Sequence, residues 1–385
     1  MFSDDLKRLI DQGLLRTISD RERTAQEKFI SPLAHVNINR TECINFASND
    51  YLGLSASPIL TKAAEEALKS FPFGAGASRL LSGGTMLHAL LEETAARFKC
   101  SESALVFNSG YQANVSCIAA LARDGDVIFS DELNHASIVD GCRLSKAKKR
   151  IYRHCDADHL AALIKEEKSG NKFVVTDTVF SMDGDIAPVN NLYTLCKSLS
   201  NTILYLDDAH GTGVLGGGRG ALAHFGLRPE PWIVQMGTFS KALGSFGAFV
   251  AGSREVINWL INTARGLIYS TALPPGVIAA SLAAITTIAK DSSFNVKLWQ
   301  NHKKAVEGIS EAGFKIICKE TPILAVTVGD IAETLAFSDK LWQRHIYAPA
   351  IRPPTVKTPR LRITVSAAHS DEDIYALIQA VNDCR

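Results

Sequence analysis

The feature that most constrains the fold of this chain is a repeated alternation of short apolar runs with longer segments of helical periodicity. Short runs that are rich in β-branched and aromatic residues are typical of buried strands. Strands that alternate with helices in this way predict an α/β domain, in which helices flank both faces of a mostly parallel sheet. The predicted strands are Ala104–Phe107, Val127–Ser130, Arg150–Arg153, Phe173–Asp177, Ile203–Leu206 and Ile233–Met236.

The pattern changes near Pro275. Two long helical segments follow, then a strand-like run at Ile323–Val328, a helix, a second run at Leu361–Val365 and a last helix. This order predicts a smaller C-terminal α+β domain, with a ligand cleft between it and the sheet. We therefore expect an N-terminal helical segment over residues 1–48, a large α/β domain over 49–275 and a small domain over 276–385.

Composition narrows the functional class. The chain has 385 residues, 46% of them hydrophobic, which is enough for a large core and more than one domain. Its 41 basic and 40 acidic residues leave a net charge of +1, so we expect no nucleic-acid or membrane partner. The eight cysteines form no C-x-x-C pair. This pattern favours free thiols in a cytoplasmic protein, with neither disulfides nor a metal site.

Two apolar segments resemble targeting or membrane signals. The first, MFSDDLKRLIDQGLL, is charged and has helical spacing through Leu6, Leu9, Ile10 and Leu14, which predicts an amphipathic helix rather than a secretory signal. The second, Leu273–Ala289, is opened by prolines and closed by a lysine below the usual length of a membrane span. We expect a buried helix there.

Lys241 is the only charged residue between Pro231 and Ser253. Burial lowers the pKa of a lysine, and a neutral amine in a dry pocket can form a Schiff base with an aldehyde. A lysine that reaches the surface along its aliphatic stem is the alternative, and neighbouring motifs decide between the two.

One such motif is YLDDAHGTG, in which the apolar run Ile203–Leu206 ends at Asp207. Carboxylates at the end of such a strand face the ligand crevice of an α/β sheet. Pyridoxal 5'-phosphate (PLP) needs a lysine for its aldehyde, an acidic partner for its pyridine nitrogen and donors for its phosphate. Lys241 and Asp207 supply the first two, and His210 is placed to reach the phenolic oxygen. Taken alone, the aspartate can cap a turn and the histidine can be structural.

The segment ALVFNSGYQAN is the candidate phosphate site. A strand ends at Phe107, a turn follows, and a helix begins near Gly110 and Tyr111. Backbone N–H groups at a helix N-terminus bind anions, and glycine permits close approach. An ordinary strand-to-helix turn is the alternative. The run Gly211–Gly216 fits G-x-G-x-x-G, but further glycines follow it where a dinucleotide site needs a helix.

Five ordered motifs together resemble those of the α-oxoamine synthases. That family consists of fold-type I PLP enzymes, which condense an amino acid with an acyl thioester and release carbon dioxide. The resemblance covers the chain from about residue 45 to its end and implies a homodimer. The motifs are NFASNDYLGL (Asn45–Leu54), SMDGD (Ser181–Asp185), DDAHGTG (Asp207–Gly213), TFSKALG (Thr238–Gly244) and YSTALPP (Tyr269–Pro275).

The resemblance also implies roles for individual residues. His135 is similar to a histidine that stacks on the cofactor and meets the substrate, Ser181 to a contact near the phenolic oxygen, and Thr238 to a phosphate contact. Ser270 and Thr271 match a segment that reaches the cofactor of the neighbouring subunit. Alone, His135 could be a helix cap, and each hydroxyl a local cap. Lys241, Asp207, His135 and His210 are the expected catalytic residues, and Gly110 and Tyr111 complete the expected cofactor contacts.

Substrate contacts follow from the segments GAGASRLLSGG and AIRPPTV. They are most similar to family members that join L-alanine to pimeloyl-CoA, or to a pimeloyl-carrier protein, in biotin biosynthesis. The resemblance places Arg352, with Thr355 beside it, at the amino-acid carboxylate, where a planar guanidinium gives bidentate recognition. After PPTV, Lys357-Thr358-Pro359 leads directly into Arg360 and shortens the loop. Asn49 is expected at the substrate, and Arg23, with Arg21 as competitor, at the acyl end.

Three interpretations stay open at this stage. The favoured one is synthesis from alanine and a pimeloyl thioester. Its rival is a sister member that uses glycine or serine or a different acyl chain, such as a 2-amino-3-ketobutyrate CoA ligase or a longer-chain aminoketone synthase. A catalytically idle binding protein of PLP fold is the third, which the presence of Lys241, Asp207, His135 and Arg352 disfavours.

Overall fold

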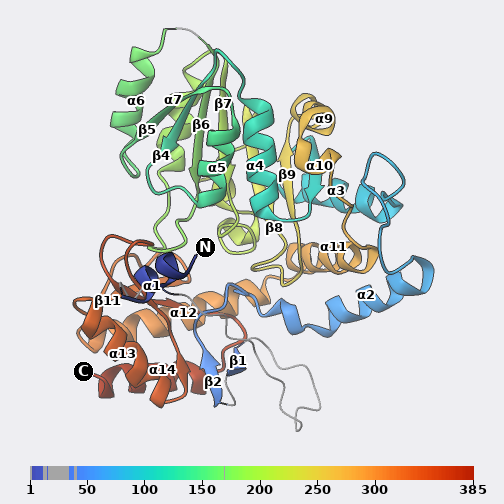
Figure 1. The fold of residues 1–385 in the computed structure, drawn as a ribbon. Coiled ribbons are helices and arrows are strands. Elements are labelled where there is room, and N and C mark those ends of the chain that lie inside the picture. The colour runs from blue at the N-terminus through green and yellow to red at the C-terminus, as the bar shows by residue number, and fades with distance from the viewer. Residues whose placement is uncertain (1, 12–14, 16–33, 39–40, 169) are drawn as a thin grey trace.

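A seven-stranded sheet forms the centre of the large domain (Figure 1). The structure is a computed structural model and describes residues 2–11, 15, 34–38, 41–168 and 170–385. Six strands run parallel, and β9 alone is antiparallel to its neighbours β3 and β8. In spatial order the strands are β3 (Ser103–Phe107), β9 (Ala248–Gly252), β8 (Ile233–Thr238), β7 (Thr202–Asp207), β6 (Lys172–Asp177), β4 (Val127–Asp131) and β5 (Lys148–Tyr152).

Successive side chains of each strand pack into different cores, one on each face of the sheet. Val175 and Tyr205 pack on one face against α4, α5, α9 and α10, while Val174 and Leu204 pack on the other against α6, α7 and α8. Because both faces are covered, the strands read as continuous apolar runs. The helices are α4 (Gly110–Leu121), α5 (Ala136–Leu144), α6 (Ala157–Glu166), α7 (Val189–Lys197), α8 (Ala221–His224), α9 (Arg254–Thr263) and α10 (Arg265–Ile268).

The helix α11 (Pro275–Lys290) packs on α2 (Pro58–Ser70) and α3 (Met86–Phe98) of the large domain. Its buried Ile278 lies in one core with Leu60 and Leu91. The expected buried helix is therefore present, and it packs on α2 and α3, although the predicted domain boundary falls near its start. Of the described helices, none taken singly has the length and hydropathy of a membrane span; only α11 and α12 together, bent by 75°, meet that test.

The small domain contains an antiparallel sheet in the order β10-β11-β14-β13. It follows the order that the sequence predicts, with α12 before β11 and α13 before β14. The elements are α12 (Ser293–Glu311), β10 (Lys315–Ile316), β11 (Ile323–Thr327), α13 (Ile331–Gln343), β12 (Ile346–Tyr347), β13 (Ala350–Ile351), β14 (Arg360–Thr364) and α14 (Asp371–Asp383).

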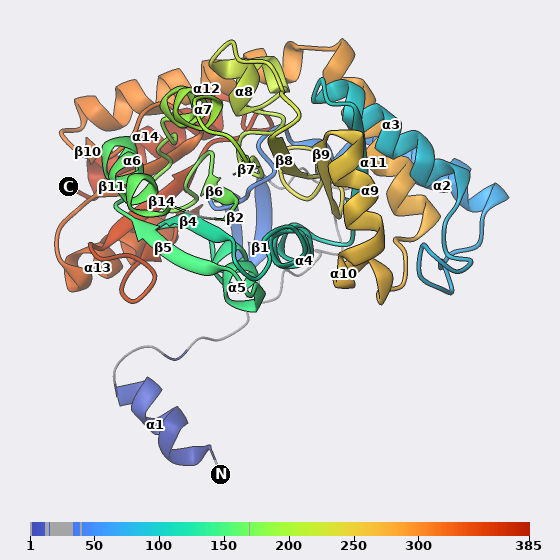
Figure 2. The same cartoon turned by 90° about the horizontal axis from the view of Figure 1, so that it is seen from above.

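The segment 1–48 is helical only in part. The amphipathic helix α1 (Ser3–Asp11) forms as expected and lies to one side of the other elements in Figure 2. A hairpin of β1 (His35–Ile38) and β2 (Thr41–Asn45) follows, and β2 pairs with β12 of the small domain. The hairpin differs from the helical expectation because its strands are completed by a partner three hundred residues away, a contact that local periodicity does not contain.

The two domains meet at the carboxyl ends of β4, β6, β7 and β8. The loop after β6 makes this contact: Arg362 of β14 donates to the carbonyl of Ser181 at 2.6 Å, and Thr321 donates to the carbonyl of Gly184 at 2.7 Å. Each of these four strands ends in Asp131, Asp177, Asp207 or Thr238, respectively. Polar side chains therefore gather where the crevice of an open α/β sheet lies.

Candidate active site

Asp207 and Asp177 end neighbouring parallel strands and lie opposite each other in register. Both are buried. Asp207 Oδ2 accepts a hydrogen bond from Asn114 Nδ2 of α4 at 2.6 Å, and its Oδ1 accepts one from the Ala209 N–H at 3.0 Å. The Asp177 carboxylate accepts the His135 N–H at 2.7 Å. Two carboxylates are thus held in fixed positions at the carboxyl ends of two central strands.

These carboxylates and Lys241 share one electrostatic environment. Burial raises the pKa of Asp207 and of Asp177, and the negative charge of Asp207 raises that of Asp177 further. Burial lowers the pKa of Lys241, while both carboxylates act in the opposite direction. Lys241 lies in the loop between β8 and β9, where Thr238 fixes the preceding turn by accepting the Ser240 N–H at 3.1 Å. The site therefore contains an amine that is less basic than an ordinary lysine.

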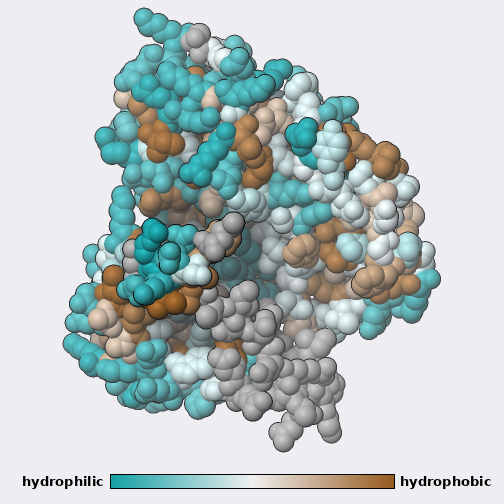
Figure 3. All heavy atoms as spheres, viewed as in Figure 1, coloured by the Kyte–Doolittle hydropathy of each residue, from teal (hydrophilic) through white to brown (hydrophobic). Residues whose placement is uncertain are grey.

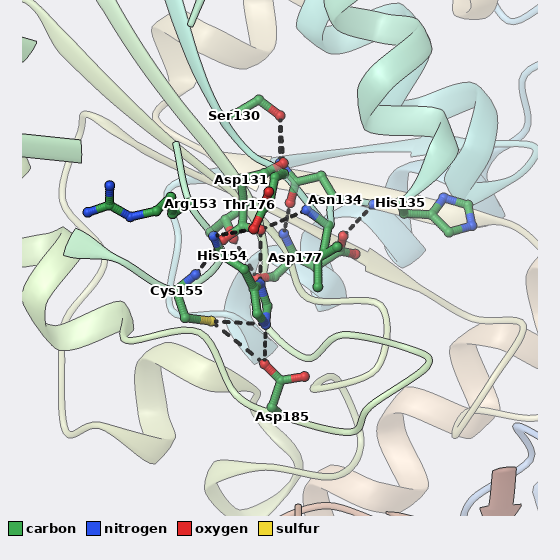
Figure 4. A network of polar contacts seen from close by, with 12 residues as sticks. Ser130, Asp131, Asn134, His135, Arg153, His154, Cys155, Thr176, Asp177 and Asp185 are labelled. Atoms are coloured by element: carbon green, nitrogen blue, oxygen red, sulfur yellow. Dashed lines mark hydrogen bonds and ion pairs between the residues drawn. The ribbon is translucent and has the colours of Figure 1, made fainter. Parts of the chain in front are cut away.

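His135 caps α5 and points its ring away from Asp177 (Figure 4). Its Nδ1 lies 2.8 Å from Ser137 Oγ, and that hydroxyl accepts from Asn114 Nδ2 at 2.8 Å. Because Asn114 also binds Asp207, His135 and Asp207 are joined through two side chains. Burial lowers the pKa of His135. His135 can therefore cap α5 and still present its ring to the ring of a ligand.

His210 is buried on the turn that follows β7. Its Nδ1 lies 2.7 Å from the hydroxyl of Tyr51, and burial raises the pKa of that hydroxyl to about 12. Burial, together with the charges of Lys241 and Arg362, holds the pKa of His210 well below its ordinary value. The lowered pKa favours the neutral ring, which can donate or accept one hydrogen bond toward a ligand.

The N-terminus of α4 fits an anion. Ser109 caps the helix by accepting the Gln112 N–H at 3.1 Å, and Gly110 and Tyr111 open its first turn. Gln112 Nε2 donates to Ser270 Oγ at 2.7 Å, which brings the segment of Ser270 and Thr271 beside this helix end. Hydroxyl and backbone N–H groups thus surround the positive end of a twelve-residue helix, as phosphate binding requires.

Asp208 serves a different purpose from its neighbour Asp207. Its Oδ2 pairs with Lys99 Nζ at 2.5 Å, and both side chains are fully enclosed. A Cβ at Gly211 or Gly220 would lie 2.1 or 1.8 Å from an Asp208 oxygen, so both positions require glycine. This packing accounts for two glycines of the glycine-rich run after β7, and the run forms turns around a buried ion pair.

The structure adds Arg362, which sequence reasoning missed. The side chain is buried, and its Nη2 donates to Asn49 Oδ1 at 3.0 Å while its Nε holds the carbonyl of Ser181. Its charge acts on both Lys241 and His210. Arg362 is a charged residue within the apolar strand LRITV, the same signal that identified Lys241. The predicted residues Asn49 and Ser181 are thereby brought to the site.

The remaining predicted residues have other surroundings. Arg352 and Thr355 line a hollow between α1 and the loop after β13, together with Leu6 and Leu9. Tyr111 stays beside the site, because its ring centroid lies 6.4 Å from that of His135; it is half-exposed and its hydroxyl bonds to Asp140. Arg23 and its competitor Arg21 lie outside the described residues. Asp177 was predicted only as a strand residue, because its role depends on the register between β6 and β7.

Comparison with known proteins places this geometry in a family. The family model of class I and II aminotransferases matches residues 41–381. A putative 8-amino-7-oxononanoate synthase of Thermodesulfovibrio yellowstonii is 51% identical over 99% of this chain and 96% of its own length, and the 8-amino-7-oxononanoate synthase of Geotalea daltonii is 44% identical over the same shares. The chain belongs to the class I and II aminotransferase family and, within it, to the family of 8-amino-7-oxononanoate synthases.

Solved structures agree with this placement. Serine palmitoyltransferase from S. paucimobilis, with a bound PLP–myriocin aldimine, has a TM-score of 0.90 at 28% identity and covers 100% of this chain and 97% of that one. The 8-amino-7-oxononanoate synthase of Francisella tularensis has a TM-score of 0.77 at 28% identity over 89% of this chain and 97% of that one. The predicted α/β fold of fold-type I PLP enzymes is confirmed.

The two adjacent aspartates should respond differently to the same change. Asp208→Asn leaves the enclosed Lys99 ammonium without a counter-charge, so we expect the free energy of unfolding to fall by about 3–5 kcal/mol. Asp207→Asn removes a charge that its neighbour Asp177 opposes, so we expect stability to change by less than about 1 kcal/mol. Urea unfolding of both variants at equal protein concentration measures the difference. Equal losses would contradict this division of roles.

Proposed function

We propose that this protein condenses L-alanine with a pimeloyl thioester, from pimeloyl-CoA or a pimeloyl-carrier protein, to give 8-amino-7-oxononanoate, carbon dioxide and a free thiol. The names of the relatives support this reaction. The single observation that carries the chemistry is the position of Lys241, an amine with a lowered pKa beside the buried pair Asp207 and Asp177. Such an amine is suited to bond an aldehyde and to exchange a proton.

The donor set fits PLP. Asp207 and Asp177 are buried carboxylates with raised pKa values, and a protonated pyridine nitrogen would supply the cation that Asp207 needs. We assign the aldehyde to Lys241 and the ring face to His135. We assign the contacts with the phenolic oxygen to His210 and Ser181. We assign the contacts with the phosphate to Gly110, Tyr111 and Thr238. When bound, PLP withdraws electrons from the α-carbon of the amino acid.

Individual residues of the chain have separate roles in this reaction. Lys241 accepts the α-proton of alanine and returns a proton to the same carbon after carbon dioxide has left. Arg362 places positive charge near Lys241 and thereby favours the neutral amine that this role requires. Arg352 and Thr355 remain the predicted partners of the amino-acid carboxylate. The α-carbon bonds to the thioester carbonyl carbon, and the thiol leaves.

A homodimer is part of this proposal. Large apolar side chains are exposed around α3 and the segment of Ser270, and apolar residues gather over α2, α3 and α11 in Figure 3. Leu81 is 81% exposed, Met86 76% and Tyr269 72%. A second copy would cover these residues beside the α4 anion site, where Ser270 and Thr271 are predicted to reach the partner's cofactor.

Sedimentation across a dilution series tests the assembly. We expect a mass of about twice the chain's 41.6 kDa at micromolar concentration, with PLP released as the dimer dissociates. Leu81→Glu should shift the equilibrium toward monomer, whereas the same substitution at Leu144, an exposed residue of α5, should not. A monomer that retains PLP would contradict the proposal of a shared site but not the proposed reaction.

The cytoplasm is the proposed compartment. All eight cysteines are free thiols in the structure, five of them buried. Thiols in such number persist where the environment is reducing.

Acyl selectivity separates this reaction from those of sister enzymes, such as the serine palmitoyltransferases that share the fold. A cation at the end of the acyl site would pair with the distal carboxylate of pimeloyl-CoA. We therefore expect a preference over a neutral acyl-CoA of similar length of about 1–3 kcal/mol, roughly ten- to hundredfold in kcat/KM.

Mass spectrometry of the products with alanine and pimeloyl-CoA, and with glycine and acetyl-CoA, measures this choice. Arg23→Ala and Arg21→Ala, made separately, should show which arginine senses the carboxylate, because only one of them should abolish the preference. Equal use of charged and neutral thioesters by the unchanged enzyme would refute the pimeloyl assignment and leave a broader acyl-condensing activity.

A further inference from the structure

A second cluster of ionisable side chains lies beside the active site, where β4 ends. Asp131 is the last residue of β4, His154 and Cys155 lie between β5 and α6, and Asp185 lies in the loop after β6. In Figure 4 the thiol, the imidazole and the Asp185 carboxylate converge on one point. None of these four side chains takes part in the proposed reaction.

The donor atoms form a compact triangle. His154 Nε2 lies 2.8 Å from Asp185 Oδ2 and 3.7 Å from Cys155 Sγ, and that sulfur lies 3.7 Å from Asp185 Oδ2. Tetrahedral zinc, with bonds of about 2.0–2.3 Å, separates such ligand atoms by about 3.3–3.7 Å. The two sulfur distances already match. His154 Nε2 and Asp185 Oδ2 would have to move apart by about half an ångström. Their hydrogen bond would then be replaced by one bond from each atom to the metal.

Asp131 supplies the outer contact that a metal-binding histidine needs. Its Oδ1 lies 3.0 Å from His154 Nδ1, which fixes the ring and leaves Nε2 directed at Asp185 and Cys155. A carboxylate on the second ring nitrogen is the usual partner of a zinc-bound histidine. Asp131 itself is buried, so this orientation is held by the end of the sheet.

Two further observations point to the same position. Cys155 has a φ of 54°, a left-handed conformation that is uncommon outside glycine, and Asp131 Oδ2 holds it there by accepting its N–H at 2.8 Å. Asp185 Oδ1 is buried and has no hydrogen-bond partner among the described residues. The backbone is therefore constrained so that the thiol points toward a carboxylate with an unused oxygen.

We propose that His154 Nε2, Cys155 Sγ and the Asp185 carboxylate bind one zinc ion, with Asp131 as the outer partner of His154. Binding displaces two protons, one from Nε2 and one from the thiol, so the charge of the cluster is the same before and after. A fourth position stays open to a water molecule. The ion joins the loops after β5 and β6, and the contact of His154 with Asp131 ties it to the end of β4, close in sequence to His135.

A purely hydrogen-bonded cluster is the competing description. Asp131 and Asp185 raise the pKa of His154 to about 12 against the effect of its burial, so without a metal the ring bridges them as an imidazolium. Proton and metal occupy the same nitrogen and exclude each other. Metal binding therefore decides between the two descriptions.

Cobalt(II) is the probe, because a four-coordinate thiolate site gives it visible absorption at longer wavelengths than PLP absorbs. Tag-free holoprotein is treated with a chelator, reduced and titrated with Co²⁺. We expect one equivalent to bind with a thiolate-type spectrum, and Zn²⁺ to displace it. Cys155→Ser, nearly isosteric with the native residue, should lose this spectrum while retaining PLP and its fold.

Cys318→Ser is the matched control at the other partly buried thiol, which contacts Glu320 at 4.0 Å, although the charge of Asp185 also reaches it. It should bind Co²⁺ as the unchanged protein does. Asp131→Asn should weaken binding by about 10- to 100-fold through loss of the outer contact. No thiolate-type spectrum in the unchanged protein, or an unaltered spectrum in Cys155→Ser, would overturn the proposal and establish the hydrogen-bonded cluster. The proposed reaction is unaffected by either result.

Discussion

Two carboxylates buried side by side at the end of a parallel sheet set the constraint on which the site depends. Asp177 and Asp207 lie in register on β6 and β7; burial raises the pKa of both, and the charge of Asp207 raises that of Asp177 further. Each ionised carboxylate must be compensated. Asn114 and the His135 N–H supply hydrogen bonds, and Lys241 supplies positive charge. A protonated ring nitrogen would complete the compensation, and this requirement selects the cofactor.

The same stretch of chain contains a second buried carboxylate with a different task. Asp207 ends β7 and contacts Asn114, whereas Asp208, the next residue, contacts Lys99, so the two side chains have different neighbours. Asp208 is neutralised by Lys99 and accepts hydrogen bonds from Thr178 and Thr212. This ion pair holds the turn that carries His210. One dipeptide thus combines an electrostatic role at the site with a structural role behind it.

Much of the fold follows from local pattern. Apolar runs between helical segments predicted six of the seven strands, since a strand covered on both faces needs no alternation. β9 was missed because its five apolar residues continue the apolar stretch around Lys241, where periodicity cannot separate a strand from a loop. The hairpin of β1 and β2 was missed because β12 completes it from a distant part of the chain.

The candidate site divides in the same way. Lys241 and Asp207 were predictable because a charge within an apolar stretch, or at its end, must be compensated, and motif resemblance supplied His135 and Ser181. Arg362 carries the same local signal but lies in the other domain, so its closeness to Asn49 depends on how the domains pack. The cluster of Asp131, His154 and Asp185 joins three loops, and no spacing in the sequence predicts it.

The identity of the aldehyde-binding lysine tests this account most directly. Purified holoprotein is reduced with borohydride, which makes a bond between PLP and lysine permanent, and the labelled peptide is mapped by mass spectrometry. The account predicts a single pyridoxyl group on Lys241, and a Lys241→Ala variant that carries no label and has lost nearly all turnover. A label on any other lysine, or holoprotein without a covalent label, would contradict it.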